Sequence, residues 1–227
     1  MRRSVPRKVS FAGRRLLITA GPTREMLDPV RFLSNVSTGE MGYALAAEAV
    51  RKGYAVTLIS GPTALKPPKG TTFIPIVSAA DLKQACDRVF SRNDILVMVA
   101  AVCDFTFPNR NPHKIRRTRV RHIRLEQTPD IVAGLAARKG KRKVIGFCLE
   151  TEKWLENASA KLVRKNLDGI VANYYSARHI PFGCRRINTA FLSAAGIVRL
   201  HRKSKRQVAS QLLAWIEGMV KKNISET

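Results

Sequence analysis

Residues 15–61 read RLLITAGPTREMLDPVRFLSNVSTGEMGYALAAEAVRKGYAVTLISG, and this stretch decides the fold. Its first six residues, 15–20, are mostly apolar and predict a buried strand ending in a Gly-Pro turn. Residues 40–52 predict an amphipathic helix, with Gly53 as the residue that follows its last turn. Residues 55–60 predict a second buried strand. A strand, a helix and a strand in this order are typical of a parallel α/β unit.

The same alternation continues along most of the chain. The other expected elements are strands at 73–77, 95–102, 144–147 and 169–173, helices at 81–90 (with Ser78 as N-cap) and 154–165, a hairpin of 189–192 with 197–200, and a final helix with Val208, Leu212, Trp215, Ile216 and Met219 on one face. We therefore expect an α/β, Rossmann-like, mostly parallel sheet with helices on both faces. A basic flap hairpin and a C-terminal hairpin and helix complete it. A basic tail (1–14) is expected to precede a single domain (15–227).

The charge balance is the unusual property of the composition. Lys and Arg number 41 against 16 Asp and Glu, which gives a net charge of +25 and favours anionic partners such as nucleic acid or phosphorylated small molecules. No apolar run is long enough to cross a membrane, and the basic N-terminus lacks a secretory h-region. The four cysteines and four histidines show no metal-ligand spacing. We expect a cytoplasmic protein whose side chains bind no metal.

The turn after the first strand argues against two large classes of nucleotide-binding protein. A nicotinamide-binding domain has GxGxxG at this turn and an acidic residue at the end of the second strand, whereas here the strands end in Gly21-Pro22 and Ser60-Gly61. The chain contains no Walker A sequence either. Instead, the small polar loop SNVSTGEMG (34–42) leads into the first helix. Free N–H groups at a helix start favour anions, although the same residues also suit an ordinary capping loop.

Several short segments form an ordered set along the chain. They are LLITAGPTREMLDPVRFLSNVSTGEMGYALA (16–46), AAVCDF (100–105), KI (114–115), TPDI (128–131), GFCLET (146–151), KLVRKNLDGIVAN (161–173) and the FG…N of Phe182, Gly183 and Asn188. In this order they resemble the phosphopantothenate–cysteine ligase (phosphopantothenoylcysteine synthetase) family of coenzyme A biosynthesis. Each segment is weak alone, whereas the ordered set is specific. In many bacteria this ligase is fused behind a flavin-dependent decarboxylase, and the chain resembles the stand-alone form.

The resemblance implies a two-step ligation. The carboxylate of 4′-phosphopantothenate attacks the α-phosphate of CTP and gives an acyl-cytidylate and pyrophosphate. The amine of L-cysteine then displaces CMP and forms the amide. Catalysis rests on positioning and on neutralising phosphate charge, with Mg²⁺ expected on the triphosphate. The preference for CTP over ATP follows the bacterial relatives, and the family also implies a homodimer.

The same resemblance implies roles for individual residues. Asn35 matches the asparagine that holds the acyl-cytidylate for the second step, and Gly39 and Met41 follow it in the substrate-binding loop. Asp104 matches the aspartate that reads the nucleotide base, and Lys114 matches the lysine of a mobile flap over the triphosphate. The remaining nucleotide contacts that the family implies are Ala100, Pro129, Asp130, Ile131, Val132, Phe147, Lys161 and Lys165.

Other interpretations of these residues stay open. Taken alone, Lys161 and Lys165 suit solvated helix charges, Phe147 suits a core position, and Asn35 suits a cap. The basic run at 114–124 also suits a nucleic-acid-binding protein, although the chain lacks RNP, KH and zinc-finger signatures. A third interpretation is a ligase-like regulatory subunit without activity, against which the retained asparagine, aspartate and flap lysine argue.

The chain departs from the usual family pattern at a few positions. Glu40 stands where a lysine is common, Cys103 and Cys148 stand where alanines are common, and Arg117 stands where the flap has a second lysine. Arginine keeps the charge but changes the hydrogen-bonding geometry. None of these positions carries a residue to which the resemblance assigns chemistry.

Overall fold

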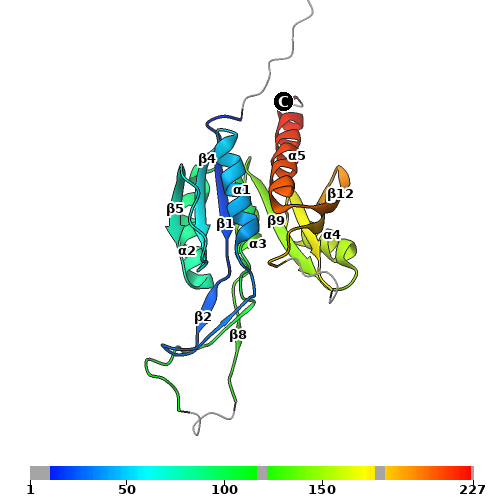
Figure 1. Ribbon diagram of the computed structural model, residues 1–227. Coiled ribbons are helices and arrows are strands. Elements are labelled where there is room, and N and C mark those ends of the chain that lie inside the picture. Colours follow the sequence, from blue (N-terminus) through cyan, green and yellow to red (C-terminus); the bar gives the residue numbers. More distant parts are fainter. Residues whose placement is uncertain (1–10, 117–121, 177–181, 226–227) are drawn as a thin grey trace, which may run out of the picture.

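The computed structural model describes residues 11–116, 122–176 and 182–225, and its central feature is an eight-stranded sheet (Figure 1). Six neighbouring strands run parallel and two antiparallel strands follow at one edge. Across the sheet the order is β12 (Gly196–Lys203), β11 (Ile187–Ser193), β10 (Gly169–Tyr174), β9 (Lys143–Glu150), β6 (Ile95–Met98), β1 (Arg15–Ala20), β4 (Ala55–Ser60) and β5 (Thr71–Pro75). The predicted mostly parallel α/β sheet with a C-terminal hairpin is confirmed.

Helices cover both faces of this sheet. Leu16 and Ile18 of β1 are buried under α1 (Glu40–Arg51) and α5 (Lys205–Ser225). Leu17, which points to the opposite face because strand side chains alternate, is buried in the cluster that contains residues of the other three helices. Those helices are α2 (Ala79–Val89), α3 (Ile131–Ala136) and α4 (Trp154–Arg164). The two-sided covering that strand–helix alternation predicts is confirmed.

Local sequence signals account for several element ends. Ser78 caps α2 as predicted, because its Oγ accepts a hydrogen bond from Asp81 N while the Asp81 carboxylate accepts one from Ser78 N. The helix begins at Ala79, two residues before the predicted start, and a 3-10 turn (Phe90–Arg92) follows it. Strand β5 lies at 71–75 rather than 73–77, since its Pro75 pairs with the last residue of β4.

Strand β6 ends four residues earlier than the apolar run predicts. The prediction of a strand to residue 102 was wrong because the Thr19 hydroxyl accepts hydrogen bonds from the N–H groups of Val99 and Ala100, both at 3.1 Å. These N–H groups are therefore not available to a neighbouring strand. After this interruption Ala101 forms a single parallel bridge with Pro22, and residues 98–102 form part of the wall of a cavity.

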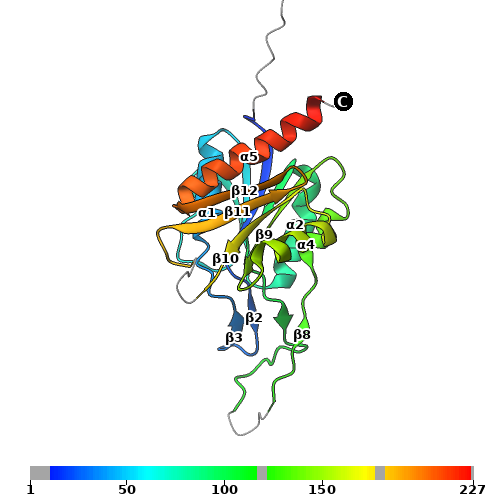
Figure 2. The ribbon, with the colours of Figure 1, turned by 90° about the vertical axis from the view of Figure 1, so that its right-hand side faces the viewer.

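Two short antiparallel pairs project from the carboxyl end of the sheet, and we call them together the arm (Figures 1 and 2). One pair is β2 (Arg24–Met26) with β3 (Phe32–Ser34), and the other is β7 (Phe105–Thr106) with β8 (Glu126–Gln127). Residues 107–125 join β7 to β8, and we call them the flap. The predicted flap hairpin is confirmed only at this base, since the described flap residues form no strand and residues 117–121, including Arg117, lie outside the described part. Residues 1–10 of the predicted basic tail also lie outside it.

Candidate active site

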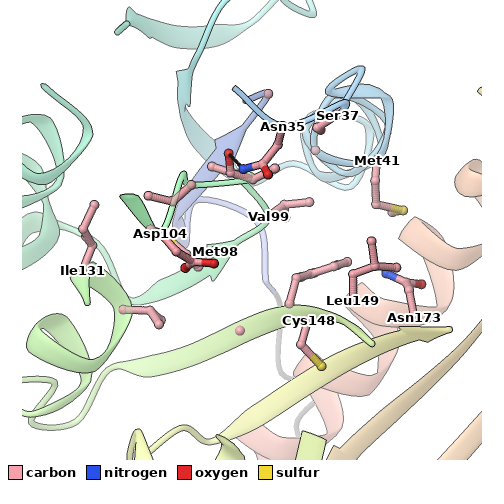
Figure 3. Close-up of a pocket in the computed structure, with 18 of the residues that line it drawn as sticks. Asn35, Ser37, Met41, Met98, Val99, Asp104, Ile131, Cys148, Leu149 and Asn173 are labelled. Carbon is pink, nitrogen blue, oxygen red and sulfur yellow. Dashed lines mark hydrogen bonds between the residues drawn. The ribbon is translucent and has the colours of Figure 1, made fainter. Parts of the chain in front are cut away.

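The carboxyl ends of β1, β6, β9 and β10 open into a cavity of about 1120 Å³. Open α/β sheets bind ligands beyond the carboxyl ends of their strands, so its position is the expected one. Figure 3 shows Asp104 and Ile131 on one side of the cavity and Met41 and Asn173 on the other, with Asn35 between them. We call these the Asp104 side and the Met41 side.

The structure brings nearly all of the predicted site residues together around this cavity. They come from the loop before α1, the segment after β6, the start of α3, strand β9 and helix α4 with its C-cap. Lys114 is the exception, because it is exposed on the flap and does not line the cavity. The residues that line it are Asn35, Gly39, Met41, Ala100, Asp104, Pro129, Asp130, Ile131, Val132, Phe147, Lys161 and Lys165.

Asn35 is held by one side of its amide. It follows β3, and its Nδ2 donates a hydrogen bond of 3.0 Å to the carbonyl of Ala101. Ser34, directly before it, is fixed in turn because its Oγ donates to the carbonyl of Thr23 at 2.8 Å. The Asn35 Oδ1 accepts no hydrogen bond from the described part of the chain, and the residue is exposed to the cavity. The amide is therefore oriented and keeps one acceptor free for a ligand.

Two glycines let α1 approach the sheet closely enough to form the cavity wall. Gly39, the N-cap, has φ +78°, and a Cβ there would lie 2.7 Å from Thr63 Cγ2. A Cβ at Gly42 would lie 2.5 Å from the Cβ of Ala20. Only glycine fits both positions without displacement, so the first turn of α1 lies against the end of β1. Free N–H groups of this first turn lie at the cavity, which favours negative charge there.

The Asp104 side is built by hydrogen bonds between two loops. Thr128 N donates to the carbonyl of Asp104 at 2.9 Å, and Thr128 Oγ1 donates to the carbonyl of Cys103 at 2.6 Å. Asp130 then caps α3, its Oδ1 accepting from Ala133 N at 3.1 Å. The loop with Asp104 and the start of α3 are thus fixed to each other, as a shared binding surface requires.

The semi-buried lysines of the cavity are each paired with a carboxylate. Lys165 Nζ lies 2.9 Å from Asp130 Oδ2, and Lys161 pairs with Glu150. Both lysine side chains are about one-fifth to one-third exposed, at 22% and 34%. Lys161 is on α4 and Lys165 is its C-cap, and both residues line the cavity. Each of these lysine charges is therefore balanced by a neighbouring carboxylate.

The two thiols near the cavity are poor nucleophiles. Burial raises the pKa of the Cys148 thiol to about 12 and also raises the pKa of Cys103. A thiol with a raised pKa is protonated at neutral pH and therefore unreactive. Both cysteines stand where the family usually has alanine, and this protonated, apolar state explains how they fit there.

Sequence reasoning missed two residues of the Met41 side. Lys205, the first residue of α5, lines the cavity, pairs with Glu40 and also donates to the carbonyl of Cys184 at 3.3 Å. It belongs to a basic run that reads as solvated charge, so nothing in the sequence distinguished it. Asn173 also lines the cavity, and its buried Oδ1 has no hydrogen-bond partner among the described residues. Asn173 could have been found from the sequence, since it ends the segment 161–173 that carries the family resemblance.

Comparisons with known proteins match nearly the whole chain to one family. The family described as "DNA/pantothenate metabolism flavoprotein C-terminal domain" matches residues 11–219. The chain is 42% identical over 212 residues to the coenzyme A biosynthesis bifunctional protein CoaBC of Bacillus subtilis, a match that covers 92% of this chain and 52% of that protein. It therefore spans about half the length of this curated relative. None of the described helices is long and apolar enough to cross a membrane.

Solved structures show the same fold. The crystal structure of the C-terminal domain of CoaBC is 37% identical, has a TM-score of 0.80, and the match covers 94% of this chain and 98% of that domain. A Cab2 mutant in complex with phosphopantothenate-cysteine is 18% identical with a TM-score of 0.78, over 94% of this chain and 88% of that one, and shows the fold alone. The resemblance drawn from the ordered segments is thereby confirmed, and the chain belongs to the DNA/pantothenate metabolism flavoprotein C-terminal domain family.

Proposed function

We propose that this chain is a phosphopantothenate–cysteine ligase. It would join 4′-phosphopantothenate and L-cysteine through an acyl-cytidylate, converting CTP to CMP and pyrophosphate. The observation that carries the proposal is the convergence on one cavity of Asn35, with a free amide oxygen, and the segments that match the family's nucleotide contacts. Membership of a family shared with CoaBC supports it.

The cavity has room for both partners of the first step. The nucleotide would lie on the Asp104 side, with its phosphates replacing Asp130 and Glu150 as partners of Lys165 and Lys161. Phosphate bears more charge than a carboxylate and makes strong charge-assisted hydrogen bonds, which favours the exchange. The carboxylate of the acyl substrate then attacks the α-phosphate, and pyrophosphate leaves. Holding both reactants in one cavity supplies the orientation that this bimolecular step needs.

Asn35 would act in the second step. Its Nδ2 is fixed to Ala101, so its free Oδ1 can accept a hydrogen bond from the incoming amine of cysteine. The amine attacks the acyl carbon, the bond to CMP breaks, and the proton that the amine loses passes to the departing CMP phosphate or to water as the amide forms. The protonated thiols of Cys103 and Cys148 do not compete for the activated acyl group.

Mg²⁺ is expected to arrive with the triphosphate and to neutralise its charge during the first step. Oxygen ligands are the class that Mg²⁺ prefers, and it usually keeps several waters beside one or two carboxylates and the phosphates. The described residues contain no group of three or more metal-binding side chains, so the phosphates and waters would be the main ligands of this ion. Asp130, on the side proposed for the phosphates, could supply one carboxylate oxygen beside them. We expect the reaction to take place in the cytoplasm.

A homodimer would bring Lys114 to a nucleotide, since this lysine lies outside the cavity of its own chain. The arm and the adjoining flap present apolar side chains that a second copy could cover, each between 36% and 52% exposed. They are Phe32, Leu33, Phe105, Ile123 and Leu125. Such an exposed apolar group is typical of an interaction surface. We propose that two arms pair and that each flap reaches the cavity of the other copy.

Hybrid dimers test this arrangement. Co-expression of Asn35→Ala and Lys114→Ala chains would give mixed dimers in which one cavity has both wild-type residues, provided that Lys114 acts across the interface. Activity of roughly a quarter of the wild-type level is then expected, because about half of the dimers are mixed and each has one intact site. If Lys114 acts within its own chain, every site lacks one residue and no activity returns.

Pyrophosphate release tests the proposed function itself. The protein is incubated with 4′-phosphopantothenate, L-cysteine, Mg²⁺ and either CTP or ATP. We expect release with CTP that depends on phosphopantothenate, and release with ATP alone would correct the nucleotide. No release with either nucleotide would refute the enzyme. RNA binding that falls steeply with salt and is not displaced by CTP would instead support the nucleic-acid-binding alternative.

A further inference from the structure

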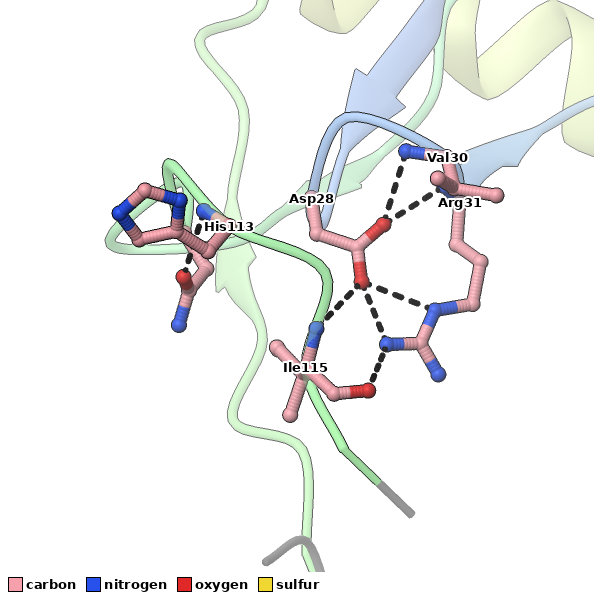
Figure 4. A network of polar contacts seen from close by, with 6 residues as sticks. Asp28, Val30, Arg31, His113 and Ile115 are labelled. Atoms are coloured by element: carbon pink, nitrogen blue, oxygen red, sulfur yellow. Dashed lines mark hydrogen bonds and ion pairs between the residues drawn. The ribbon is translucent and has the colours of Figure 1, made fainter.

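The ion pair of Asp28 and Arg31, in the turn between β2 and β3, forms hydrogen bonds with the flap (Figure 4). The carboxylate of Asp28 is fully buried and pairs with the Arg31 guanidinium. Asp28 Oδ2 also accepts a hydrogen bond of 3.2 Å from Ile115 N, and Arg31 Nη2 donates one of 2.9 Å to the carbonyl of Ile115. Both backbone polar groups of this single flap residue are therefore bound by the same ion pair.

Only part of the hydrogen bonding of Asp28 and Arg31 is needed to form the turn in which they lie. Asp28 Oδ1 accepts from Val30 N and Arg31 N, both at 2.9 Å, and these two bonds already form the local side-chain turn that aspartate commonly makes. Oδ2 and the outer end of the guanidinium are directed instead at a segment more than 80 residues away in the sequence. Asn111 N donates to the carbonyl of Leu27 at 3.0 Å, so the same turn holds the flap at a second point.

The Asp28–Arg31 ion pair connects the flap segment that carries Lys114 to the strand that leads into Asn35, the two residues to which the proposed function gives chemical roles. The N–H that Asp28 binds belongs to the peptide bond joining Lys114 to Ile115, which fixes the backbone that carries the Lys114 side chain. Arg31 is followed directly by β3, which leads into Asn35. The flap residue next to Lys114 and the strand that leads into Asn35 are therefore joined by one ion pair, whose carboxylate is buried and whose Arg31 side chain is 46% exposed.

We infer that Asp28 and Arg31 are positioning residues that set where Lys114 meets the nucleotide and tie the flap to the loop carrying Asn35. The inference rests on the proposed function, because it takes Lys114 to contact the nucleotide. Arg31 matters here through its second hydrogen bond, to Ile115, as well as through its charge. A lysine at this position can keep the pairing with Asp28 but lacks the planar fork that reaches both partners.

Kinetic constants of Asp28→Asn and Arg31→Lys separate positioning from a purely structural role. A misplacement of about 1 Å at a reacting group can cost on the order of a hundredfold, so we expect the KM for CTP to rise about tenfold or more in both variants. Because their effect on CTP passes through Lys114, combining either with Lys114→Ala should add nothing to the rise in the KM for CTP that Lys114→Ala causes alone. The matched control is Glu48→Gln, which breaks a similar pair three residues apart on α1, with a carboxylate 4% exposed and Arg51 61% exposed, far from the flap in sequence. Its KM for CTP should be unchanged.

Limited trypsin digestion measures how firmly the ion pair holds the flap, and it does not depend on enzyme activity. Cleavage after Arg116, the residue following Ile115, should be faster in Asp28→Asn and Arg31→Lys than in the wild type and in Glu48→Gln. An unchanged cleavage rate in both variants overturns the inference, and so do additive kinetic losses in the double variants. If the wild type released no pyrophosphate, the proposed function would fail while the digestion still decided whether the ion pair holds the flap. If Asp28→Asn does not fold, Arg31→Lys carries both readouts.

Discussion

Replacing Gly42 by alanine tests how closely α1 must approach the sheet. An added Cβ would lie 2.5 Å from Ala20 Cβ and 3.2 Å from both Ala20 Cα and the carbonyl oxygen of Thr19. Carbon atoms in contact prefer about 3.5–4.0 Å, so the first turn of α1 has to retreat by roughly 1 Å. Such overpacking costs about 1–3 kcal/mol, and the better helix propensity of alanine offsets up to about 1 kcal/mol. We expect a net loss of about 1–2 kcal/mol in the free energy of unfolding.

Equilibrium unfolding in urea measures this loss, and Gly218→Ala is the matched control. Gly218 lies on the exposed side of α5 and has no atom within 4 Å of an added Cβ, so the same substitution there should stabilise by about 0.5–1 kcal/mol. The retreat of α1 also displaces Gly39 and Met41 from the cavity wall, and the KM for the acyl substrate should rise in Gly42→Ala only. A Gly42→Ala protein as stable as the wild type would refute the packing argument.

Three further substitutions test separate parts of the structure. Asn35→Ala should accumulate acyl-cytidylate while product formation falls on the order of a hundredfold, measured by quenched-flow chromatography; unimpaired product formation would refute its role. Glu40→Lys should destabilise the protein by about 1 kcal/mol, because it faces Lys205 with a second cation and opposes the α1 dipole; thermal unfolding measures this, and Glu40→Lys/Lys205→Glu should recover most of the loss. Arg51 lowers the pKa of Glu48 to about 2 from its ordinary 4.5, so the stability that this carboxylate adds is complete above pH 4.5 and is lost as the pH falls toward 2. Glu48→Gln should therefore cost about 1–3 kcal/mol at pH 7 and progressively less below pH 4.5; a gap that did not narrow in acid would contradict the assignment.

The long apolar strands and the helices beside them could be read from the sequence. Strands β1 and β4 occur at the predicted residues because each is a six-residue, mostly apolar segment closed by Gly-Pro. The end of β6 could not be predicted, since it depends on the Thr19 hydroxyl, which lies 80 residues before Val99 in the sequence. Strands of two or three residues in the arm, and the six-residue α3, carry too little periodicity to be detected.

Some residues of the candidate site could be predicted from the sequence and others could not. Asn35 and Asp104 were found because they belong to ordered segments shared with a known family, and the structure places both at one cavity. Lys205 was missed because a lysine in a basic run looks solvated until the fold brings it to Glu40. The distance of Lys114 from the cavity could not be predicted either, since it follows from how Asp28 and Arg31 direct the flap.

The fate of a carboxylate oxygen tests the central claim most directly. 4′-Phosphopantothenate labelled with ¹⁸O in its carboxylate is incubated with the protein, L-cysteine, CTP and Mg²⁺, and the masses of the products are measured by mass spectrometry. Attack of the carboxylate on the α-phosphate predicts that one labelled oxygen leaves in CMP as 4′-phosphopantothenoylcysteine forms, with one CMP per product. Label in inorganic phosphate beside CDP, or no ligated product at all, would contradict the account.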